Sequence, residues 1–355
     1  MRLPTEQVGS IPRPAALIEG IPGFEAGRIS QLELNALYHS AVQDTIQRLE
    51  ATGSPVITDG EQAKHSFATY SIYGLENLAP DGMPIPFADG HVRKFPRLTA
   101  GPFKYKTPAD VYLELAQKYA HVPLKQPVAS ASALSLLYPQ GGIPGYSREQ
   151  YLGDLIAEQE EEIRRCLTKG AHMVQMDFTE GRLSLKLDPT RRLLHSFIDL
   201  NNLVLERFSP EERKRLGVHT CPGADRHSSH SAEVDYAELL PSLFELQATN
   251  FYIQLASEPD RKRVLKMIRE HAKDEQRIFV GVIDPLDPRV DTPEDVRDRV
   301  LEAAEYIPLD RLGTTDDCGF APFADDTSRT RETAFNKIRA RVAGTALASK
   351  VLGLE

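Results

Sequence analysis

The sequence predicts a single (β/α)8 TIM barrel over residues 1–355, an α/β fold in which eight parallel strands alternate with helices. Short runs rich in β-forming residues alternate with longer amphipathic runs, which is typical of a parallel sheet. Eight strand candidates suit a closed barrel better than an open sheet. Polar residues follow these strands at their carboxyl ends, which in a barrel converge on one face.

The first two units precede a long irregular segment. Residues 8–14 (VGSIPRP) form the first strand candidate, and the helix pattern of residues 31–53 follows it. Residues 54–62 (SPVITDGEQ) form the second, which ends in an acidic turn. Residues 63–124 are rich in Pro, Gly and aromatic residues and are too long for a simple connection. We therefore expect an insertion after the second strand that forms a lid over one end of the barrel.

The remaining units alternate regularly. Their strand candidates are residues 126–133, 172–178, 215–221, 250–256, 277–284 and 310–315. The longest helix candidate, 148–170, ends at Gly170, which is suited to a C-terminal cap. Residues 291–307 open with Thr, Pro, Glu and Asp, the usual order of a cap, a first-turn proline and an acidic first turn.

Composition narrows the class of protein. A formal net charge of −9 argues against nucleic acid or an anionic membrane surface as a partner. The N-terminus lacks the apolar region of a signal peptide, and no apolar run approaches the roughly 18 residues of a membrane span. Three cysteines give no disulfide framework. We expect a reduced, cytoplasmic protein that acts on small molecules, and a homo-oligomer is compatible with this class.

A metal site is the most specific chemical hypothesis. His219 and Cys221 lie two residues apart, on the same side of an extended strand end, and Cys318 follows the last strand candidate. His and Cys are preferred zinc ligands, and three protein ligands leave a position open for substrate, as in catalytic zinc sites. On spacing alone, the interpretation of both cysteines as small buried apolar residues is equally favoured.

Other polar residues have competing interpretations. Asp225, His227 and His230 could supply a ligand or a proton donor, although a solvated loop is the simpler interpretation. Cys166 lies within a helix pattern and is assigned to packing. Acidic residues at strand ends often cap a helix or pair with an arginine, and this structural role is favoured for Asp59.

The chain resembles the catalytic half of cobalamin-independent methionine synthase and its single-domain relatives. The motifs that carry the resemblance occur in that family's order, and they are VGSIPRP at 8–14, DGE at 59–61, QMDFTEG at 175–181, HTC at 219–221 and DDCG at 316–319. The resemblance spans essentially the whole chain, and residues 63–124 match loosely. It implies that zinc binds a thiol such as homocysteine, lowers its pKa and presents a thiolate to a 5-methyltetrahydrofolate-type donor.

The resemblance also implies roles for individual residues. Val8, Gly9 and Ser10 correspond to a turn that binds the amino-acid substrate. Glu61 and Asp177 correspond to carboxylates that bind the substrate's amino group. Glu180 corresponds to the residue that contacts the pterin ring of the donor.

Three departures from the family pattern stand out. The family's zinc-binding glutamate after the sixth strand matches Gln254, so Glu258 could substitute or the site could use three protein ligands. The family's proton-donating histidine after the seventh strand is missing, which leaves Asp284, Asp287 and, further away, His227 as acid–base candidates. The indole that contacts folate is also absent, because the chain has no Trp.

Alternative functions follow from these departures. With a neutral Gln254 in place of the family's glutamate, the zinc site is about one charge less negative. This change favours formation of the thiolate but lowers the reactivity of the thiolate. Such a site suits a more reactive electrophile, as in the epoxyalkane:coenzyme M transferases of the same superfamily. A metal-free decarboxylase of the uroporphyrinogen decarboxylase type would need free arginines at strand ends, for which Arg13 and Arg182 are candidates. A non-enzymatic carrier or scaffold is the last alternative.

Overall fold

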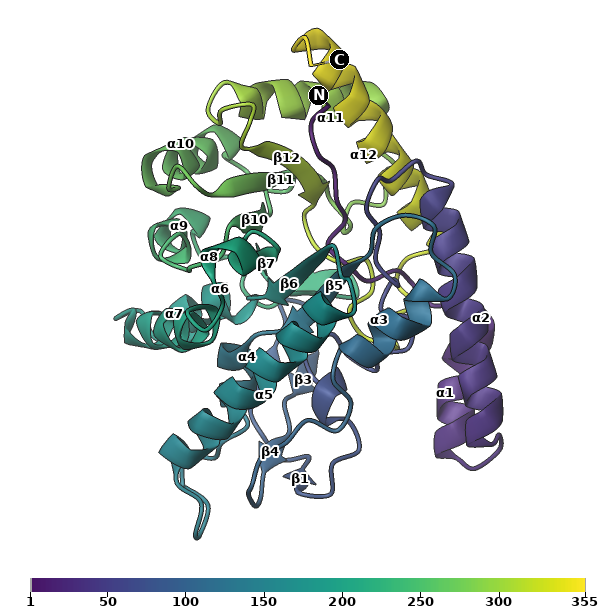
Figure 1. The fold of residues 1–355 in the computed structure, drawn as a ribbon, viewed down its shortest axis with the longest axis vertical. Coiled ribbons are helices and arrows are strands. Elements are labelled where there is room, and N and C mark those ends of the chain that lie inside the picture. Colours follow the sequence, from purple (N-terminus) through teal and green to yellow (C-terminus); the bar gives the residue numbers. More distant parts are fainter. Residues whose placement is uncertain (1, 355) are drawn as a thin grey trace.

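The computed structural model describes residues 2–354 of the chain. Its centre is a six-stranded parallel sheet with the order β12-β11-β10-β7-β6-β5 (Figure 1). The strands are β5 (Lys125–Ala129), β6 (Met173–Asp177), β7 (Leu216–Thr220), β10 (Asn250–Ile253), β11 (Arg277–Ile283) and β12 (Leu312–Asp316). Each lies within or overlaps one of the last six predicted strands, so the α/β fold class is confirmed. The prediction at 126–133 runs too far, because Ser130 caps helix α4 through the N–H of Ala133.

Two N-terminal segments extend the sheet at its edges. Thr5 forms a parallel bridge with Thr314 of β12, and Ile57 forms one with Leu124, just before β5. The prediction of regular strands at 8–14 and 54–62 was wrong, because each segment makes only an isolated bridge or none. Prolines within both segments lack the N–H that a strand ladder requires. The two bridges nevertheless place the chain at residue 5 beside β12 and at residue 57 beside the start of β5, the two edges of the sheet.

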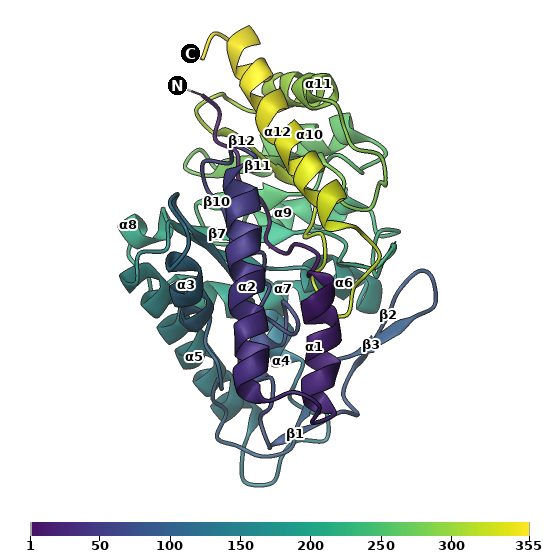
Figure 2. The same cartoon turned by 90° about the vertical axis from the view of Figure 1, so that its right-hand side faces the viewer.

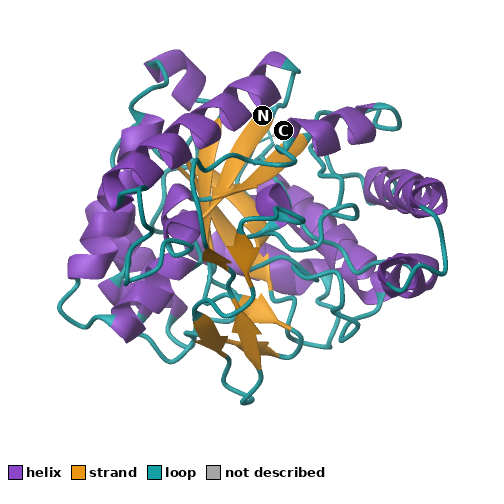
Figure 3. Cartoon of the chain, turned by 90° about the horizontal axis from the view of Figure 1, so that it is seen from below, coloured by secondary structure: helices purple, strands orange, loops and turns teal. Residues whose placement is uncertain are grey.

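Helices surround the strands on the outside (Figure 3). The longer helices are α1 (Ala15–Glu25), α2 (Gln31–Glu50), α5 (Arg148–Thr168), α7 (Arg192–Leu205), α10 (Arg261–His271), α11 (Pro293–Ala304) and α12 (Arg331–Val351). The shorter ones are α3 (Asp110–Gln117), α4 (Ala131–Ser135), α6 (Glu180–Leu187), α8 (Pro210–Arg213) and α9 (Leu240–Leu243). Within residues 2–354, no helix combines the length and the apolar character needed to span a membrane.

The predicted helix ends are correct at two places. Thr292 caps α11 and forms a capping box with Asp295. Gly170 follows α5 with φ = +87°, a backbone conformation that glycine adopts without strain. In Figure 2, α12 crosses the molecule beside α2, and it also packs against α11. The N–H of Leu3 donates to Ser349 of α12 at 3.1 Å, so this helix also holds the N-terminal segment.

Residues 63–124 form small elements at one end of the sheet (Figure 1). Strand β1 (Leu78–Ala79) pairs with β4 (Arg97–Leu98), and β2 (Pro84–Pro86) pairs with β3 (Val92–Lys94). A short 3-10 helix, Tyr70–Ile72, and α3 complete the segment. The interpretation of this segment as a lid inserted into a single domain stays a prediction.

A buried ion pair links the last helix to the sheet. The guanidinium of Arg341, in α12, donates to Asp316 at the end of β12 and to the backbone oxygen of Glu6. The other carboxylate oxygen of Asp316 accepts a hydrogen bond of 3.2 Å from the N–H of Val8. Both charged side chains are almost fully buried. This pair therefore fixes the N-terminal segment and the end of β12 at the same point.

We expect Arg341→Met to lower the free energy of unfolding by about 3–5 kcal/mol, because it leaves the Asp316 carboxylate buried and unpaired. Urea denaturation measures this loss. The matched control is Arg339→Met, which changes an exposed arginine of the same helix. That variant should remain within about 0.5 kcal/mol of the wild-type chain. Equal losses in the two variants would contradict this role for the pair.

Candidate active site

A small cavity opens where the carboxyl ends of the strands meet. This is the face on which barrel enzymes place their chemistry. Predicted site residues from five separate parts of the chain line this cavity, and they are Val8, Gly9, Ser10, Glu61, Asp177, His219 and Cys318. The structure therefore brings together most of the residues predicted to bind the metal or the thiol substrate.

His219, Cys221 and Cys318 form a buried His–Cys–Cys group. Their ligand atoms lie within 4.8 Å of one another. The two sulfurs are 3.0 Å apart and the cysteines are free, since a disulfide bond would measure about 2.05 Å. His219 comes from the end of β7, and Cys318 follows β12, which lies three places along the sheet. The curvature of the sheet and the loops that follow these strands bring them together.

The hydrogen bonding of His219 leaves one ring nitrogen available. Nδ1 lies 3.1 Å from the backbone oxygen of Tyr252, and a carbonyl can only accept, so Nδ1 carries the proton. Nε2 is buried and has no hydrogen-bond partner among the described residues. Metal-binding histidines are commonly oriented in this way, with the second nitrogen donating to a carbonyl. An unpartnered imidazole nitrogen beside two thiols fits a zinc-type ion.

The two cysteines differ in their ease of ionisation. The hydrogen bond from Cys221 lowers the pKa of the Cys318 thiol well below its usual value, and His219 adds to this effect. Burial raises the pKa of Cys221 well above its usual value. Cys318 is therefore the first of the two to become a thiolate, the form that binds metals.

The two predicted fourth ligands differ in availability. Arg182 holds the Glu258 carboxylate at 2.8 Å, and Glu258 lies outside the His–Cys–Cys group. The amide nitrogen of Gln254 donates to Ser257 at 2.7 Å and to Glu258 at 3.1 Å. The amide oxygen of Gln254 is buried without a partner among the described residues. Of the two candidates, Gln254 has the free oxygen.

Asp317 positions the turn that follows β10. Its carboxylate accepts hydrogen bonds of 2.7–2.8 Å from the N–H groups of Leu255, Ala256 and Ser257. Burial, followed by the charge of Asp284, raises the pKa of Asp317 to about 7. Sequence reasoning missed this role, although Asp317 stands beside Cys318 in the DDCG motif.

The N-terminal turn packs tightly against the residues after Cys318. Ser10 accepts hydrogen bonds from the N–H groups of Phe320, at 2.9 Å, and Ala321, at 3.2 Å. A Cβ atom on Gly319 would lie 2.2 Å from the Ser10 hydroxyl, so this close approach requires glycine. The predicted amino-acid-binding turn is thus held beside the His–Cys–Cys group.

Two carboxylates flank the same cavity. Glu61 has φ = +55° and receives a hydrogen bond of 2.9 Å from the buried ammonium group of Lys64. Asp177 accepts one of 2.8 Å from Gln175. Burial raises the pKa of Asp177 to about 7, with His219 opposing this shift and Glu61 adding to it. Sequence reasoning missed Lys64, because nothing in its local pattern indicates a buried ion pair.

The terminal guanidinium nitrogens of Arg13 and Arg182 are both hydrogen-bonded within the protein. Arg13 donates to backbone oxygens of Glu61, Lys64 and the loop after β12. Arg182 donates to Glu258 and to backbone oxygens of residues 232 and 234. Neither guanidinium is free to bind the carboxylates of a substrate, so both arginines have structural roles.

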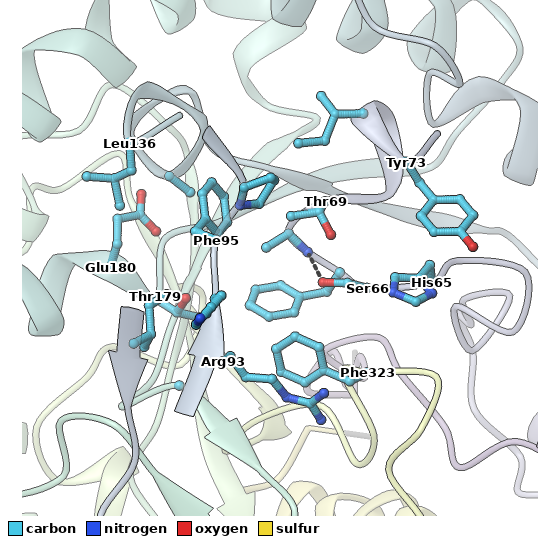
Figure 4. Close-up of a pocket in the computed structure, with 18 of the residues that line it drawn as sticks. His65, Ser66, Thr69, Tyr73, Arg93, Phe95, Leu136, Thr179, Glu180 and Phe323 are labelled. Carbon is cyan, nitrogen blue, oxygen red and sulfur yellow. Dashed lines mark hydrogen bonds between the residues drawn. The ribbon is translucent and has the colours of Figure 1, made fainter. Parts of the chain in front are cut away.

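A larger cavity of about 770 Å³ adjoins the small one (Figure 4). The two share four lining residues, which are Phe67, Thr179, Gly223 and Ala224. Apolar side chains from residues 67–96 and from α4 and α6 form most of its wall. Glu180 lines this larger cavity instead of the small one, and Figure 4 shows it beside Thr179 and Leu136.

Glu180 combines a satisfied and an unsatisfied oxygen. One carboxylate oxygen accepts hydrogen bonds from Ser130 and Ser132. The other is buried and has no partner among the described residues. Burial raises the pKa of Glu180 to about 7 despite the two serines. The group can therefore receive a hydrogen bond from a ligand, or donate one when protonated.

The predicted acid–base residues line neither cavity. Asp284 and Asp287 accept backbone hydrogen bonds from residues two positions ahead, at 2.8 and 2.9 Å, and so stabilise turns. His227 is exposed. Their catalytic role stays a prediction. His230, which the sequence grouped with His227, is buried and lines the larger cavity, and burial lowers its pKa to about 3.

Comparison with known proteins adds independent evidence. The family model described as "Cobalamin-independent synthase, Catalytic domain" matches residues 3–345. A methionine synthase from Sulfurisphaera tokodaii is 24% identical over 354 residues, which cover 99% of this chain and 94% of the relative. A 5-methyltetrahydropteroyltriglutamate–homocysteine methyltransferase from Vibrio cholerae is 22% identical, with 89% of this chain and 40% of the relative covered.

A solved structure shows the same fold. The B12-independent methionine synthase from Shewanella sp. W3-18-1, in complex with selenomethionine, superimposes with a TM-score of 0.77. The match covers 100% of both chains at 19% sequence identity.

Glu180→Gln should make stability less dependent on pH. Burial raises the folded-state pKa of Glu180 to about 7, whereas an unfolded glutamate titrates at about 4.3. Between these values the folded chain keeps a proton that the unfolded chain releases. The contribution of this group to stability is therefore complete below the unfolded pKa and is lost as the pH rises to 7.

Glutamine resembles the protonated form and does not titrate, so the variant should gain up to about 3.5 kcal/mol over the wild-type chain between pH 4 and pH 8. Urea unfolding of both proteins across this range measures the difference. Parallel stability profiles would show that Glu180 does not titrate abnormally.

Proposed function

Because the chain belongs to the catalytic-domain family of cobalamin-independent methionine synthases, which are methyltransferases, we propose that it transfers a methyl group to a thiol. The acceptor would be a zinc-activated thiol such as homocysteine, and the donor would be of the 5-methyltetrahydrofolate type. The observation that carries the proposal is the buried His–Cys–Cys group with its unpartnered imidazole nitrogen. His219, Cys221 and Cys318 would hold the ion, and three protein ligands leave a position for the thiol. When bound, zinc supplies the Lewis acidity that lowers a thiol's pKa.

The protein's own residues would orient the thiol substrate. Glu61 and Asp177 present carboxylates to its ammonium group on the wall of the small cavity. Lys64 fixes the Glu61 side chain from behind, through a hydrogen bond of 2.9 Å. Val8, Gly9 and Ser10 line the same cavity. This arrangement limits the space next to the cysteines to a small amino acid.

The larger cavity would receive the methyl donor. It adjoins the small cavity through the four shared lining residues, so a donor bound there reaches the thiol without leaving the protein. The free oxygen of Glu180 offers a hydrogen-bond acceptor to the N–H groups of a pterin-type ring. Phe, Tyr and His side chains in the wall supply the stacking surface that Trp cannot provide in this chain.

A second candidate is the opening of an epoxide by a zinc-activated thiol. The apolar wall of the larger cavity favours it, because a compact apolar electrophile needs few polar partners. The neutral Gln254 beside the turn after β10 is compatible with the same chemistry. The decarboxylase alternative loses its support, because Arg13 and Arg182 are occupied by internal hydrogen bonds.

Zinc content tests the ligand assignment. The wild-type chain should retain about one zinc ion after dialysis, as expected for a three-ligand site. Cys221→Ser and Cys318→Ser should each lose most of it, because a hydroxyl is a much weaker zinc ligand than a thiolate. Cys166→Ser is the control, since Cys166 is buried in α5 outside the group. A zinc-loaded Cys318→Ser protein would rule out the assignment.

Product analysis tests the reaction. Zinc-loaded protein supplied with homocysteine and 5-methyltetrahydrofolate should form methionine, detected by mass spectrometry. Cys221→Ser should lower the rate at least about 100-fold, because Lewis-acid activation contributes several kcal/mol. Cys166→Ser should keep the wild-type rate. If zinc binds but no methionine forms, 1,2-epoxypropane with 2-mercaptoethanesulfonate tests the second candidate through its thioether product.

A further inference from the structure

The hairpin formed by β2 and β3 forms part of the wall of the larger cavity. Ile85, Phe87, Val92 and Arg93 of this hairpin line the cavity. Its tip is attached to β9 (Ser228–Ser229), which belongs to the loop after β7. In that attachment, Ala88 N–H donates to the Ser229 oxygen at 3.0 Å. The cavity wall is thus fastened to a loop that begins at one of the cysteines.

Arg93 makes the most extensive of these attachments. Its guanidinium donates to both carboxylate oxygens of Asp225, at 2.5 and 3.1 Å. It also donates to both oxygens of Asp325, each at 2.9 Å. The same group lies 4.2 Å from the centre of the Phe323 ring, and Figure 4 shows the two side by side. Only the planar fork of an arginine can hold two carboxylates in this way.

The two aspartates belong to the loops that carry the cysteines. Asp225 lies four residues after Cys221, and Asp325 lies seven residues after Cys318. The Asp225 side chain is fully buried, whereas that of Asp325 is about half exposed. His91 adds a contact of 2.9 Å to Asp225 from the same hairpin. One guanidinium therefore connects the cavity wall to both cysteine-bearing loops.

We propose that Arg93 is a positioning residue that couples the position of the β2–β3 hairpin to the arrangement of Cys221 and Cys318. This proposal rests on the proposed function in one respect only, which is that the His–Cys–Cys group binds a metal. Removal of the guanidinium leaves the negative charge of Asp225 buried with fewer hydrogen bonds and without its ion-pair partner. It also breaks the connection of the two loops to the hairpin. Both the cavity wall and the spacing of the cysteines should then loosen together.

Hydrogen exchange followed by mass spectrometry tests this coupling in the full-length protein. The variant is Arg93→Met, which keeps the length of the side chain and removes its charge. Exchange should accelerate by roughly 10-fold in residues 84–94, and also in residues 222–230 and 319–326, with or without added zinc. Arg93→Lys should behave similarly, because an ammonium group cannot hold both carboxylates in the same geometry.

The matched control is Arg97→Met. Arg97 belongs to the same segment and makes a similar two-bond contact, at 3.0 Å, but its partner is Asp81. This variant should accelerate exchange only near residues 78–98. Asp325→Asn, which retains the contact with Asp225, should affect residues 319–326 more than residues 222–230. Acceleration confined to residues 84–94 in Arg93→Met would overturn the proposal.

The rate of zinc release gives a second readout that does not depend on catalysis. With a chromogenic chelator in excess, Arg93→Met should release zinc roughly 10-fold faster than the wild-type chain, as expected for residues that support metal ligands. Arg97→Met should release it at the wild-type rate. An unchanged rate in Arg93→Met would overturn the link to the cysteines. If the wild-type chain binds no zinc, the proposed function fails, whereas the exchange experiment still decides the coupling.

Discussion

Asp316, at the carboxyl end of β12, accepts hydrogen bonds from Arg341 of α12 and from the N–H of Val8. The next residue, Asp317, binds three N–H groups of the turn after β10, and the residue after that is Cys318. Three consecutive residues thus join the N-terminal turn, the last helix, the turn after β10 and the His–Cys–Cys group. The geometry of the site depends on the alignment of this one strand end.

Three buried carboxyl groups in and beside the site have pKa values raised to near 7. Burial raises the pKa values of Asp177, Glu180 and Asp317 to about 7. Each has hydrogen-bond donors that partly offset the cost of desolvation, as buried polar groups require. Near pH 7, Asp177 and Glu180, which line the two cavities, can therefore accept a hydrogen bond when ionised or donate one when protonated. A binding site with this property can adjust its charge to that of the ligand.

Much of the fold follows from local pattern in the sequence. The alternation of short β-rich runs with amphipathic runs predicts the last six strands, because each pattern reports the environment of its own segment. The position of His219, Cys221 and Asp177 at strand ends predicts their common face. The first two strand positions could not be predicted in detail. Their single bridges at Thr5 and Ile57 depend on partners more than 60 residues away.

The contacts that organise the site are less accessible from sequence. Arg93 meets Asp225 and Asp325, which lie 132 and 232 residues away along the chain. Lys64 is buried against Glu61 although lysine is usually exposed. Neither residue has a periodicity or spacing that indicates its partner. Such pairings depend on how the loops meet in three dimensions, and only the structure places them.

The separation of the two cysteines along the chain has a thermodynamic consequence. Cys221 and Cys318 are 97 residues apart, and their sulfurs meet only in the folded chain. An ion held by both would close this long loop, as a covalent cross-link does, and the entropy of the unfolded chain would fall. The free energy of metal binding would then contribute directly to the free energy of folding. Depletion of the metal would lower the resistance of the whole barrel to heat, including parts far from the site.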